Sequence, residues 1–411
     1  MGEYQVLMKT RIFIGLGLAL WALASASARE ISPDRLPQTI TQPGDYRVTG
    51  PLAYAGTSNG ITVMANGVTI DLNGFALVGT VAGDHGIYQP ATYRDLTVRN
   101  GIVRQWTGAS SYGLLLEGSN TRVEDVQVLN CNEAIQCGKA ARVDRCTAIG
   151  NSTAGDGYGI AVGWASQVRH CQVVSNQAAG IFGGLMLEED SSAEGCIVSE
   201  AYSSSVAFGI FGDGRNRIEA CAVSIVRAAD VAYGIEASEG STVRHCSVSR
   251  IEASTAFGAS TAIGGGDKGR VERCAVSSCG GSSGNGSGIY LSQYGRAEGN
   301  AVRGNRYDGI SLSRDNWVRW NISSLNGTGA DGVAGIKVFN EGNRVLENHL
   351  VQNHYGVKVT ASNSFFARNS CHANTQAGSV GPSNNLPLAL LSPGIDFNAL
   401  AAPYNFHDVI W

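Results

Sequence analysis

The residues in this chain best suited to chemistry are two lysines and a tyrosine that share one place in a repeated phrase. Tyr290, Lys337 and Lys358 each directly follow a glycine–aliphatic pair. On adjacent strands of a sheet the two lysines would lie about 5 Å apart, close enough to bind one carboxylate or sulfate together. A tyrosine or lysine beside such an anion can also serve as a general base. These three are our candidate catalytic residues.

The same place in other copies of the phrase holds residues that could contact a bound molecule. In chain order they are Tyr88, Phe182, Phe211, Glu236 and Ser311. Aromatic rings on an exposed face offer flat surfaces on which a ring-shaped ligand can stack. We predict that these five residues bind substrate. The simpler interpretation, a mixed and solvated face of a long sheet, stays open.

Six cysteines recur at a nearly constant interval, and each closes a similar short phrase. The gaps are 25, 25, 25, 25 and 28 residues, and the cysteines are Cys146, Cys171, Cys196, Cys221, Cys246 and Cys274. Asparagine then takes the same place at Asn300, Asn321, Asn348 and Asn369. A fixed period of this length indicates one structural unit stacked many times. We expect a ladder of buried thiols, continued by asparagines that pass amide hydrogen bonds from unit to unit.

The glycine–aliphatic pair marks the same unit 13 times, with steps of 21 to 29 residues. Alanine replaces glycine at Ala134 and Ala262, and the other pairs begin at Gly60, Gly86, Gly113, Gly159, Gly180, Gly209, Gly234, Gly288, Gly309, Gly335 and Gly356. Short alternating segments in each unit are typical of half-buried strands, and no segment is long enough for a crossover helix. The sequence therefore predicts an all-β parallel β-helix (solenoid) of about 13 rungs, with the glycines in tight turns at positive φ.

The composition supports a large core and limits the choice of partner. Of 411 residues, 43% are hydrophobic and 16% are charged, and the formal net charge is -4. Low charge with this much apolar content argues against disorder. The absence of a basic excess argues against a nucleic-acid partner.

The N-terminal residues have the features of a signal peptide. Lys9 and Arg11 supply positive charge, residues 12–24 are apolar, and residues 26–28 (Ala-Ser-Ala) suit a cleavage site. The apolar stretch is short for a membrane span, which needs about 20 residues. We expect residues 1–28 to be removed and the protein to be secreted, periplasmic or at the cell surface, without a membrane span. An uncleaved anchor is the alternative.

The rest of the chain divides into a repeat region and two ends. We expect an N-terminal cap over residues 29–59, the parallel β-helix over residues 60–372 and a capping tail over residues 373–411. Solenoid ends need such covers because their last rungs would otherwise expose the core. We predict one domain and a monomer.

Neither a metal site nor a disulfide is clearly indicated. No cysteine pair has a further cysteine or histidine at zinc spacing. Glu188, Glu189 and Asp190 form an acidic stretch that could attract Ca²⁺, although a solvated loop is the simpler interpretation. A Cys131–Cys137 bridge is the alternative to free thiols. No cofactor is therefore certain, and Ca²⁺ stays open.

Charged residues occupy two further places in the unit, just before the cysteine or asparagine. One row holds Asp144, Arg169, Glu194, Glu219, Arg244, Glu272, Glu298 and Arg319. The neighbouring row holds Arg142, Arg217, Arg270, Arg296 and Arg344. Surface ion pairs are the simplest interpretation, and a site for an anionic polymer is the alternative.

The repeated phrase resembles the PbH1-type repeat of secreted bacterial β-helix proteins in the pectin-lyase-like superfamily. The segment Thr-Ile-Thr-Gln-Pro-Gly-Asp-Tyr at residues 39–46, leading to residues 68–74, is similar to the start of many of these proteins. The resemblance covers roughly residues 40–372 and implies a right-handed coil. It implies a polysaccharide partner without naming an activity, because this superfamily carries lyases, hydrolases, epimerases, tailspikes and proteins without known activity.

The family's hydrolase phrases do not occur in this chain. The nearest match, Gly335-Ile336-Lys337, lacks the arginine of the Arg-Ile-Lys phrase. Asp308 could belong to a hydrolase pair of carboxylates, but an aspartate before glycine fits a turn better. We predict a protein that binds or processes an acidic polysaccharide, with a uronate lyase as the favoured activity. A non-catalytic surface or scaffold protein is the alternative.

Overall fold

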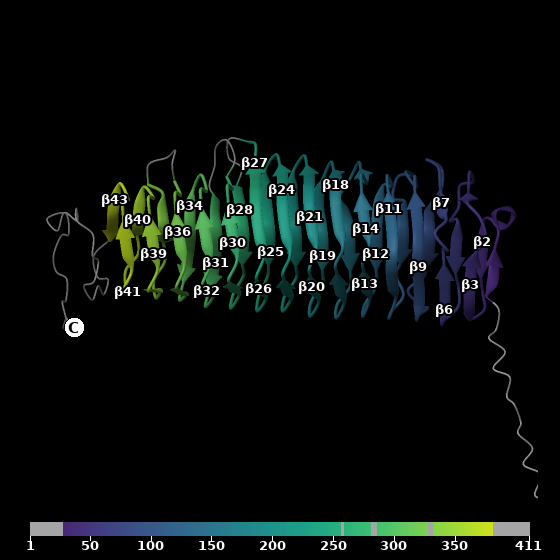
Figure 1. The fold of residues 1–411 in the computed structure, drawn as a ribbon, viewed down its shortest axis with the longest axis horizontal. Helices are drawn as coiled ribbons and strands as arrows, with labels where there is room; N and C mark the ends of the chain where they lie inside the picture. The colour runs from purple at the N-terminus through teal and green to yellow at the C-terminus, as the bar shows by residue number, and fades with distance from the viewer. Residues whose placement is uncertain (1–27, 256–258, 281–285, 328–331, 381–411) are drawn as a thin grey trace, which may run out of the picture.

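The computed structural model describes residues 28–255, 259–280, 286–327 and 332–380, and the statements below concern these residues. They form 43 strands and one short 3-10 helix, η1 (Pro33–Arg35). Figure 1 shows the strands coiled into an elongated solenoid, and successive rungs pair in parallel. The prediction of an all-β parallel β-helix of about 13 turns is confirmed.

The first of the two sheets has 15 strands, each paired with the next one in the list. They are β2 (Gln38–Ile40), β5 (Ile61–Val63), β8 (His85–Gln89), β10 (Tyr112–Leu116), β12 (Glu133–Cys137), β16 (Gly157–Val162), β19 (Ile181–Leu187), β22 (Val206–Gly212), β25 (Val231–Ala237), β28 (Ala259–Gly265), β31 (Gly286–Gln293), β34 (Asp308–Arg314), β37 (Ala334–Val338), β40 (Tyr355–Val359) and β43 (Gln376–Val380).

The second sheet has 28 strands and covers the rest of the coil. Its first half comprises β1 (Arg29–Ile31), β3 (Gly44–Val48), β4 (Leu52–Ala53), β6 (Val68–Asp71), β7 (Ala76–Val78), β9 (Leu96–Arg104), β11 (Arg122–Leu129), β13 (Arg142–Asp144), β14 (Thr147–Ile149), β15 (Ser152–Thr153), β17 (Gln167–Arg169), β18 (Gln172–Ala178), β20 (Ser192–Glu194) and β21 (Ile197–Ser203). Its second half comprises β23 (Arg217–Glu219), β24 (Ala222–Ala228), β26 (Thr242–Arg244), β27 (Ser247–Ala253), β29 (Arg270–Glu272), β30 (Ala275–Ser277), β32 (Arg296–Glu298), β33 (Ala301–Arg303), β35 (Trp317–Arg319), β36 (Ile322–Ser324), β38 (Arg344–Leu346), β39 (His349–Val351), β41 (Phe365–Ala367) and β42 (Ser370–His372).

The core lies inside the coil, where equivalent aliphatic residues stack from rung to rung. Ile160, for example, pairs with Ile135 on one side and Leu185 on the other, and all three are at most 1% exposed. Each such side chain contributes roughly 1.5–3 kcal/mol by leaving water. Because the register is kept, the same column is apolar along the whole coil.

Each rung of the 28-stranded sheet turns sharply just before its cysteine or asparagine. His170, between β17 and β18, has a φ of 51°, and Arg145 and Ala220 have the same left-handed conformation. This conformation costs about 1–2 kcal/mol for a residue with a side chain. The next residue compensates by hydrogen bonding, since the Cys171 thiol donates to the Arg169 carbonyl at 3.1 Å and to the Val143 carbonyl of the preceding rung at 3.5 Å.

The predicted ladder of thiols and amides is confirmed, and its two parts are continuous. The six ladder cysteines are 0–2% exposed. The Cys274 backbone N–H donates to Asn300 Oδ1 at 2.8 Å. From there the side-chain amides donate along the series at 2.9 Å per step, through Asn300, Asn321, Asn348 and Asn369. These bonds satisfy buried polar groups that would otherwise be costly.

Two further polar ladders run along the coil that the sequence pattern did not reveal. Side-chain amides donate from Asn305 to Asn326 at 2.9 Å and from Asn326 to Asn353 at 3.1 Å. In another ladder the Ser166 backbone N–H donates to Ser191 Oγ, and the Ser191 N–H donates to Asn216 Oδ1. Mixed residue types hide the serine and asparagine ladder in the sequence.

None of the glycines of the glycine–aliphatic pairs has a positive φ, and most of them lie inside strands rather than in turns, so that prediction is wrong. Gly159 and Gly209 lie inside strands of the 15-stranded sheet, and neither is among the residues with positive φ. A Cβ at Gly159 would lie 2.4 Å from Val173 Cγ1 and 2.8 Å from the Gly184 carbonyl oxygen. Glycine is needed there because the rung interior leaves no room for a side chain.

The sheets extend beyond the boundaries of the predicted repeat region. β2 lies before residue 60 and pairs with β5, and β43 lies after residue 372 and pairs with β40.

Cys131 and Cys137 are both free and buried. The predicted signal peptide falls almost wholly on residues 1–27, and most of the predicted tail falls on residues 381–411, which lie outside the described residues. The described part of the chain has no helix with the length and hydrophobicity of a membrane span.

We expect the Asn321→Ala substitution to destabilise the coil. Asn321 is fully buried and accepts hydrogen bonds from both the backbone and the side chain of Asn300. Removing its amide leaves buried donors unpaired, at about 1–3 kcal/mol each. The free energy of unfolding in urea should fall by about 2–5 kcal/mol. Asn340→Ala, at an exposed position, should change it by about 0.5 kcal/mol or less, and equal effects of the two would contradict the ladder.

The buried thiols should be unreactive until the protein unfolds. All ten cysteines are free and buried, and burial raises the pKa of Cys131, Cys137 and Cys371 above the ordinary thiol value, which disfavours the reactive thiolate. A thiol reagent should label almost no cysteine in the native protein and ten after denaturation without reductant. Fewer thiols in the denatured sample would reveal disulfides and contradict this arrangement.

Candidate functional site

The outer face of the 15-stranded sheet carries a row of half-buried side chains that follow the aliphatic residue of each rung. We call it the post-aliphatic row. The pairing register places in it Tyr88, Leu115, Gln136, Ala161, Met186, Phe211, Glu236, Gly264, Tyr290, Ser311, Lys337 and Lys358. Seven of the eight predicted site residues therefore share one line along the coil.

Phe182 is the exception, and its predicted exposure is wrong. It is 2% exposed and lies in register with Gly157 and Ala207, inside the coil. The sequence pattern pointed to Gly180 and Ile181 as the glycine–aliphatic pair of this rung. The residues in register with the other pairs are Gly184 and Leu185, four positions later, so Met186 rather than Phe182 lies in the post-aliphatic row. The regular step of 25 residues from Gly159 to Gly184 and Gly209 could have revealed this.

A second row on the same face consists of the residues just before the glycine of each pair. This row was not predicted from the sequence. We call it the pre-glycine row, and the register places in it His85, Tyr112, Glu133, Tyr158, Gly183, Phe208, Tyr233, Thr261, Ser287, Asp308, Ala334 and Tyr355. Phe208 and Tyr233 stack with ring centroids 5.2 Å apart and planes 5° apart. The recurrence of an aromatic residue directly before glycine was the available signal.

The two lysines are adjacent, as predicted, but they differ in their partners. Lys337 and Lys358 pair across β37 and β40. Lys337 Nζ lies 3.3 Å from Asp308 Oδ2, so its charge is compensated within the protein. Lys358 Nζ donates to the Gly332 carbonyl at 3.2 Å and lies over the Tyr355 ring. No described carboxylate pairs with Lys358.

Asp308 is a buried strand residue rather than the turn residue that we expected. It is 6% exposed at the start of β34 and accepts hydrogen bonds from the Ala334 backbone N–H at 2.8 Å and from Ser311 Oγ at 3.3 Å. Burial raises the pKa of Asp308, and the charge of Lys337 opposes that shift. Ser311 is itself only 6% exposed, so it supports Asp308 and has little surface for a substrate.

Tyr290 is too far from the lysine pair to act with Lys358 on one sugar unit. Three strand-to-strand steps, through β34 and β37, separate it from Lys358, and each step spans about 4.8 Å. Its ring stacks instead on Phe339, with centroids 6.2 Å apart. Burial raises the pKa of Tyr290, with a further contribution from Glu236, so its phenol is better suited to donate a proton than to accept one.

Glu236 is the neighbouring group that is suited to accept a proton. Gly264 follows Glu236 in the post-aliphatic row, and Tyr290 follows Gly264. A Cβ placed on Gly264 would lie 1.8 Å from Glu236 Oε2. The Glu236 carboxyl therefore fills the space over Gly264 and extends toward Tyr290. Burial raises the pKa of Glu236 to about 7. A carboxyl with this pKa can exchange protons near neutral pH.

A second carboxyl with a raised pKa lies nearer the N-terminal end of the same face. Glu133 is 7% exposed, and burial raises its pKa to about 7. It pairs with Tyr112 in the pre-glycine row, and Tyr158 follows it there. Its Oε2 has no hydrogen-bond partner. Glu133 is thus a member of the pre-glycine row with little exposed surface.

A hollow of about 320 Å³ lies over the middle of the two rows. Its floor includes Gln136, Ala161, Met186 and Phe211 of the post-aliphatic row and Tyr158 of the pre-glycine row. Glu188 and Asp213 form its rim. The face is therefore concave where aromatic and small residues of neighbouring rungs meet.

The acidic stretch Glu188–Asp190 is not arranged as a metal site. Arg215 Nη2 lies 2.7 Å from Glu189 Oε2, and Arg215 Nε lies 2.7 Å from Asp190 Oδ1. The arginine thus neutralises two of the three carboxylates. Among the described residues, no group of three or more histidine, cysteine or acidic side chains could hold a metal ion.

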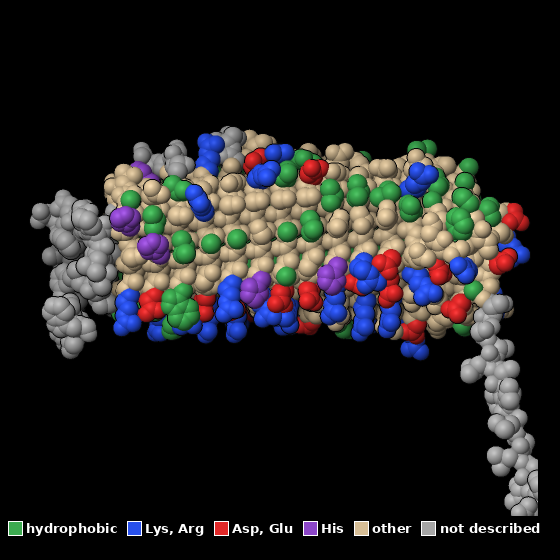
Figure 2. Space-filling view, viewed as in Figure 1, with side chains coloured by type: hydrophobic (Ala, Val, Ile, Leu, Met, Phe, Trp, Pro, Cys, Tyr) green, Lys and Arg blue, Asp and Glu red, His purple; other side chains and the backbone are tan. Residues whose placement is uncertain are grey.

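The first of the two charged rows forms surface ion pairs along one edge of the coil, seen as basic and acidic side chains at the bottom of Figure 2. Arg244 pairs with Glu219 at 2.7 Å, and Arg319 pairs with Glu298 at 3.2 Å. Of the neighbouring row, Arg217 also pairs with Glu219. Surface ion pairs therefore account for the first row, and a site for an anionic polymer at the neighbouring row stays a prediction. Such exposed pairs add little stability each.

Comparisons with known proteins find similar solved structures at low sequence identity. The sequence matches no family model and no curated protein. The chain is similar to the periplasmic alginate epimerase AlgG, with a TM-score of 0.41, 12% identity and coverage of 80% of this chain and 76% of that one. It is similar to the A-module of a mannuronan C-5 epimerase from Azotobacter vinelandii, with a TM-score of 0.35, 12% identity and coverage of 86% and 91%.

A tailspike protein of Bacteriophage CBA120 has a TM-score of 0.49 and 10% identity. The match covers 88% of this chain and 56% of the tailspike chain. None of these similarities assigns an activity to this chain, so the functional argument depends on its own residues.

The Glu236→Gln substitution should remove part of the pH dependence of stability. The folded pKa of Glu236, about 7, lies above the ordinary value of 4.5, so the unfolded chain loses this proton first as the pH rises. The stability contributed by the protonated carboxyl is therefore full below about pH 4.5 and is lost by about pH 7. Thermal and urea unfolding should show the variant about 1–3 kcal/mol more stable than the native protein above pH 7, and equally stable near pH 4. Glu30→Gln, at an exposed position, should leave the pH profile unchanged, and a native profile for Glu236→Gln would contradict the raised pKa.

Proposed function

We propose that this protein binds an acidic polysaccharide along the outer face of its 15-stranded sheet. The observation that carries the proposal is the pair of in-register rows, which place aromatic, acid–base and cationic side chains on successive strands across one face. A linear polymer can contact many rungs at once, because equivalent side chains recur about every 4.8 Å. The hollow over Tyr158, Met186 and Phe211 gives the polymer a concave surface.

The side chains of the two rows supply the contacts that a sugar chain needs. Tyr88, Phe211 and Tyr290 are half-buried and offer ring surfaces for stacking. Lys358 supplies a cation without a carboxylate partner among the described residues, which favours a polymer that carries carboxylate or sulfate groups. The backbone contributes no such contacts, because its polar groups are used in the parallel pairing between rungs.

Cleavage by elimination is a second candidate function, favoured by the position of Glu236 beside Tyr290. Ionised Glu236 would take the proton from C5 of a uronate unit, and the electron pair would form the C4–C5 double bond. The C4–O bond to the neighbouring unit would break, and Tyr290 would give its phenolic proton to the departing oxygen. The proton held by Glu236 would then return to the Tyr290 phenolate.

This arrangement changes the roles that the sequence predicted for the three catalytic candidates. Tyr290 becomes the acid rather than the base, and the base is Glu236. Lys358 binds the carboxylate of a different sugar unit, and Lys337 stays with Asp308. Binding without cleavage, by an exported monomer that serves as a surface protein, is the alternative.

Binding and elimination are tested together with purified protein on polygalacturonate, alginate and a glycosaminoglycan, with and without Ca²⁺. We expect Lys358→Ala to weaken binding about tenfold, as expected for the loss of a charge-assisted contact. Glu236→Gln and Tyr290→Phe should leave binding within about threefold and abolish the ultraviolet absorbance of an unsaturated uronate product.

The matched control is Lys268→Ala, because Lys268 is an exposed lysine that is paired with Glu239 and lies outside both rows. It should bind like the native protein. No absorbance with any polymer would exclude the lyase and leave the binding protein. If none of the three polymers binds, or if Lys358→Ala and Lys268→Ala bind equally well, the proposed site is wrong.

A further inference from the structure

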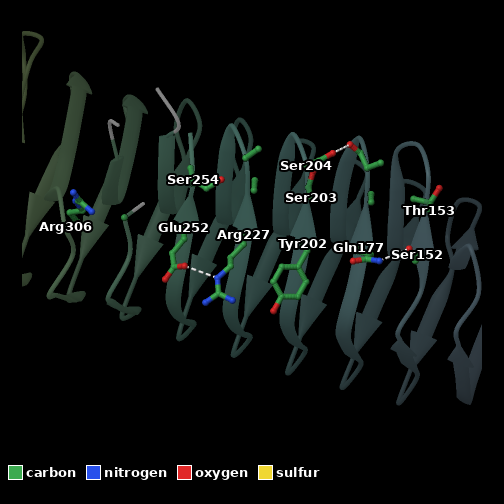
Figure 3. Close-up of a pocket in the computed structure, with 16 residues that line it drawn as sticks. Ser152, Thr153, Gln177, Tyr202, Ser203, Ser204, Arg227, Glu252, Ser254 and Arg306 are labelled. Carbon is green, nitrogen blue, oxygen red and sulfur yellow. Dashed lines mark hydrogen bonds and ion pairs between the residues drawn. The ribbon is translucent and has the colours of Figure 1, made fainter. Parts of the chain in front are cut away.

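A groove of about 800 Å³ runs across several rungs at the corner where the 28-stranded sheet turns toward the 15-stranded one. Figure 3 shows its residues on β15, β18, β21, β24 and β27, with Gln177, Tyr202, Arg227 and Glu252 aligned on neighbouring strands. None of its lining residues belongs to the two rows of the candidate functional site. It is therefore a separate concave surface that crosses the strands.

The floor of the groove is a third in-register row, and most of its members are polar. The pairing of the strands brings Ser152, Gln177, Tyr202, Arg227 and Glu252 together in that order. Gln177 Nε2 donates to Ser152 Oγ at 3.0 Å, and Arg227 Nε donates to Glu252 Oε2 at 2.9 Å. The half-buried Tyr202 ring lies between these two hydrogen-bonded pairs.

The groove is hollow because the residues after this row are small. The next residue on each strand is Ala178, Ser203, Ala228 or Ala253, and the following turn holds Ala179, Ser204, Ala229 or Ser254. Ala178, Ala228 and Ala253 are buried in the core, but a larger side chain in the following turn, at Ala179, Ser204 or Ala229, would fill the hollow that the neighbouring rungs share. The cavity thus depends on a run of alanine and serine over four successive rungs.

The charge of the groove is positive by one unit. Arg227 is compensated by Glu252. Arg306, at one end of the groove, is exposed and forms no ion pair with any described residue. A ligand that fits the floor and places an anionic group beside Arg306 would therefore gain a charge-assisted hydrogen bond.

The construction of the groove favours a sugar chain over a peptide. An extended peptide usually binds by adding a strand to an unpaired sheet edge, but β18, β21 and β24 are each paired on both sides. The groove offers only side chains, with one aromatic ring, a series of hydrogen-bonding groups and an available cation. Aromatic stacking combined with side-chain hydrogen bonds is suited to pyranose rings, which have apolar faces and hydroxyl edges.

We infer that this corner groove is a second binding site for an acidic polysaccharide, separate from the outer face of the 15-stranded sheet. Tyr202 stacks on a sugar ring, Gln177 and Ser152 bond its hydroxyls, and Arg306 binds a carboxylate or sulfate of a unit further along. The inference rests on the proposed function in taking a polysaccharide as the partner. It assigns the groove no chemistry and gives the protein two contacts with one long chain or with two chains.

The test is isothermal titration of the full chain with polygalacturonate and alginate fragments, and with neutral dextran of the same length. Tyr202→Ala and Arg306→Ala should each weaken binding of the acidic fragments about fivefold to tenfold. Ala179→Trp, which fills the groove from an exposed turn, should do the same without removing any contact group. Dextran should bind more weakly and should lose no affinity with Arg306→Ala.

Arg104→Ala is the matched control, since Arg104 is also exposed and forms no ion pair among the described residues but lies outside the groove and outside the charged rows. It should bind like the native protein, and an equal loss would mean general electrostatic attraction and would overturn the inference. Native affinity in all three groove variants would overturn it too. Circular dichroism and thermal unfolding confirm that each variant is folded.

The two sites can fail independently. If Lys358→Ala weakens binding and the groove variants do not, the outer face stands and the groove is not a site. If only the groove variants weaken binding, the groove stands and the outer face is not the site. Binding of an extended peptide without binding of any polysaccharide would overturn both assignments.

Discussion

The constraint on which the rest of this structure depends is in-register stacking of the rungs. Parallel pairing fixes each residue beside its equivalents one rung away, so one choice of residue type is repeated along the coil. The amide ladder keeps this register, because its hydrogen bonds form only when equivalent side chains align. The thiols contribute by donating to backbone carbonyls of their own and the preceding rung. They also offset the cost of the left-handed residues that precede them, such as His170 and Ala220.

The same constraint places side chains of one kind in rows across the outer surface. On the 15-stranded sheet it produces two rows of aromatic and ionisable residues, and at the corner it produces the row from Ser152 to Glu252. Rows of this kind fit a polymer because both repeat along one direction. A single small ligand would use only a few of these positions.

Burial of carboxyl groups within or beneath these rows tunes their chemistry. Glu236 and Glu133 have pKa values of about 7 because the surrounding sheet excludes water from them. The Asp308 carboxyl is also buried, and it pairs with Lys337. This ion pair uses the charge of Lys337, which is then not available to an external anion. The position of each group relative to its neighbours on adjacent rungs therefore decides whether it is a proton carrier, an anion site or part of an internal pair.

The sequence by itself determined the fold and the ladder, and the register of every rung but the one that contains Phe182, because the constant spacing of cysteines and asparagines follows from equivalent residues that stack. It also identified seven members of the post-aliphatic row, since they share one offset from the glycine–aliphatic pair. Tertiary structure alone decided the burial of Ser311, the pairing of Lys337 with Asp308, and the reason for the glycines. It also revealed the hollow over the small turn residues Ala179, Ser204 and Ala229. These features depend on contacts between residues on different rungs and on the volume left between them, which spacing along the chain does not encode.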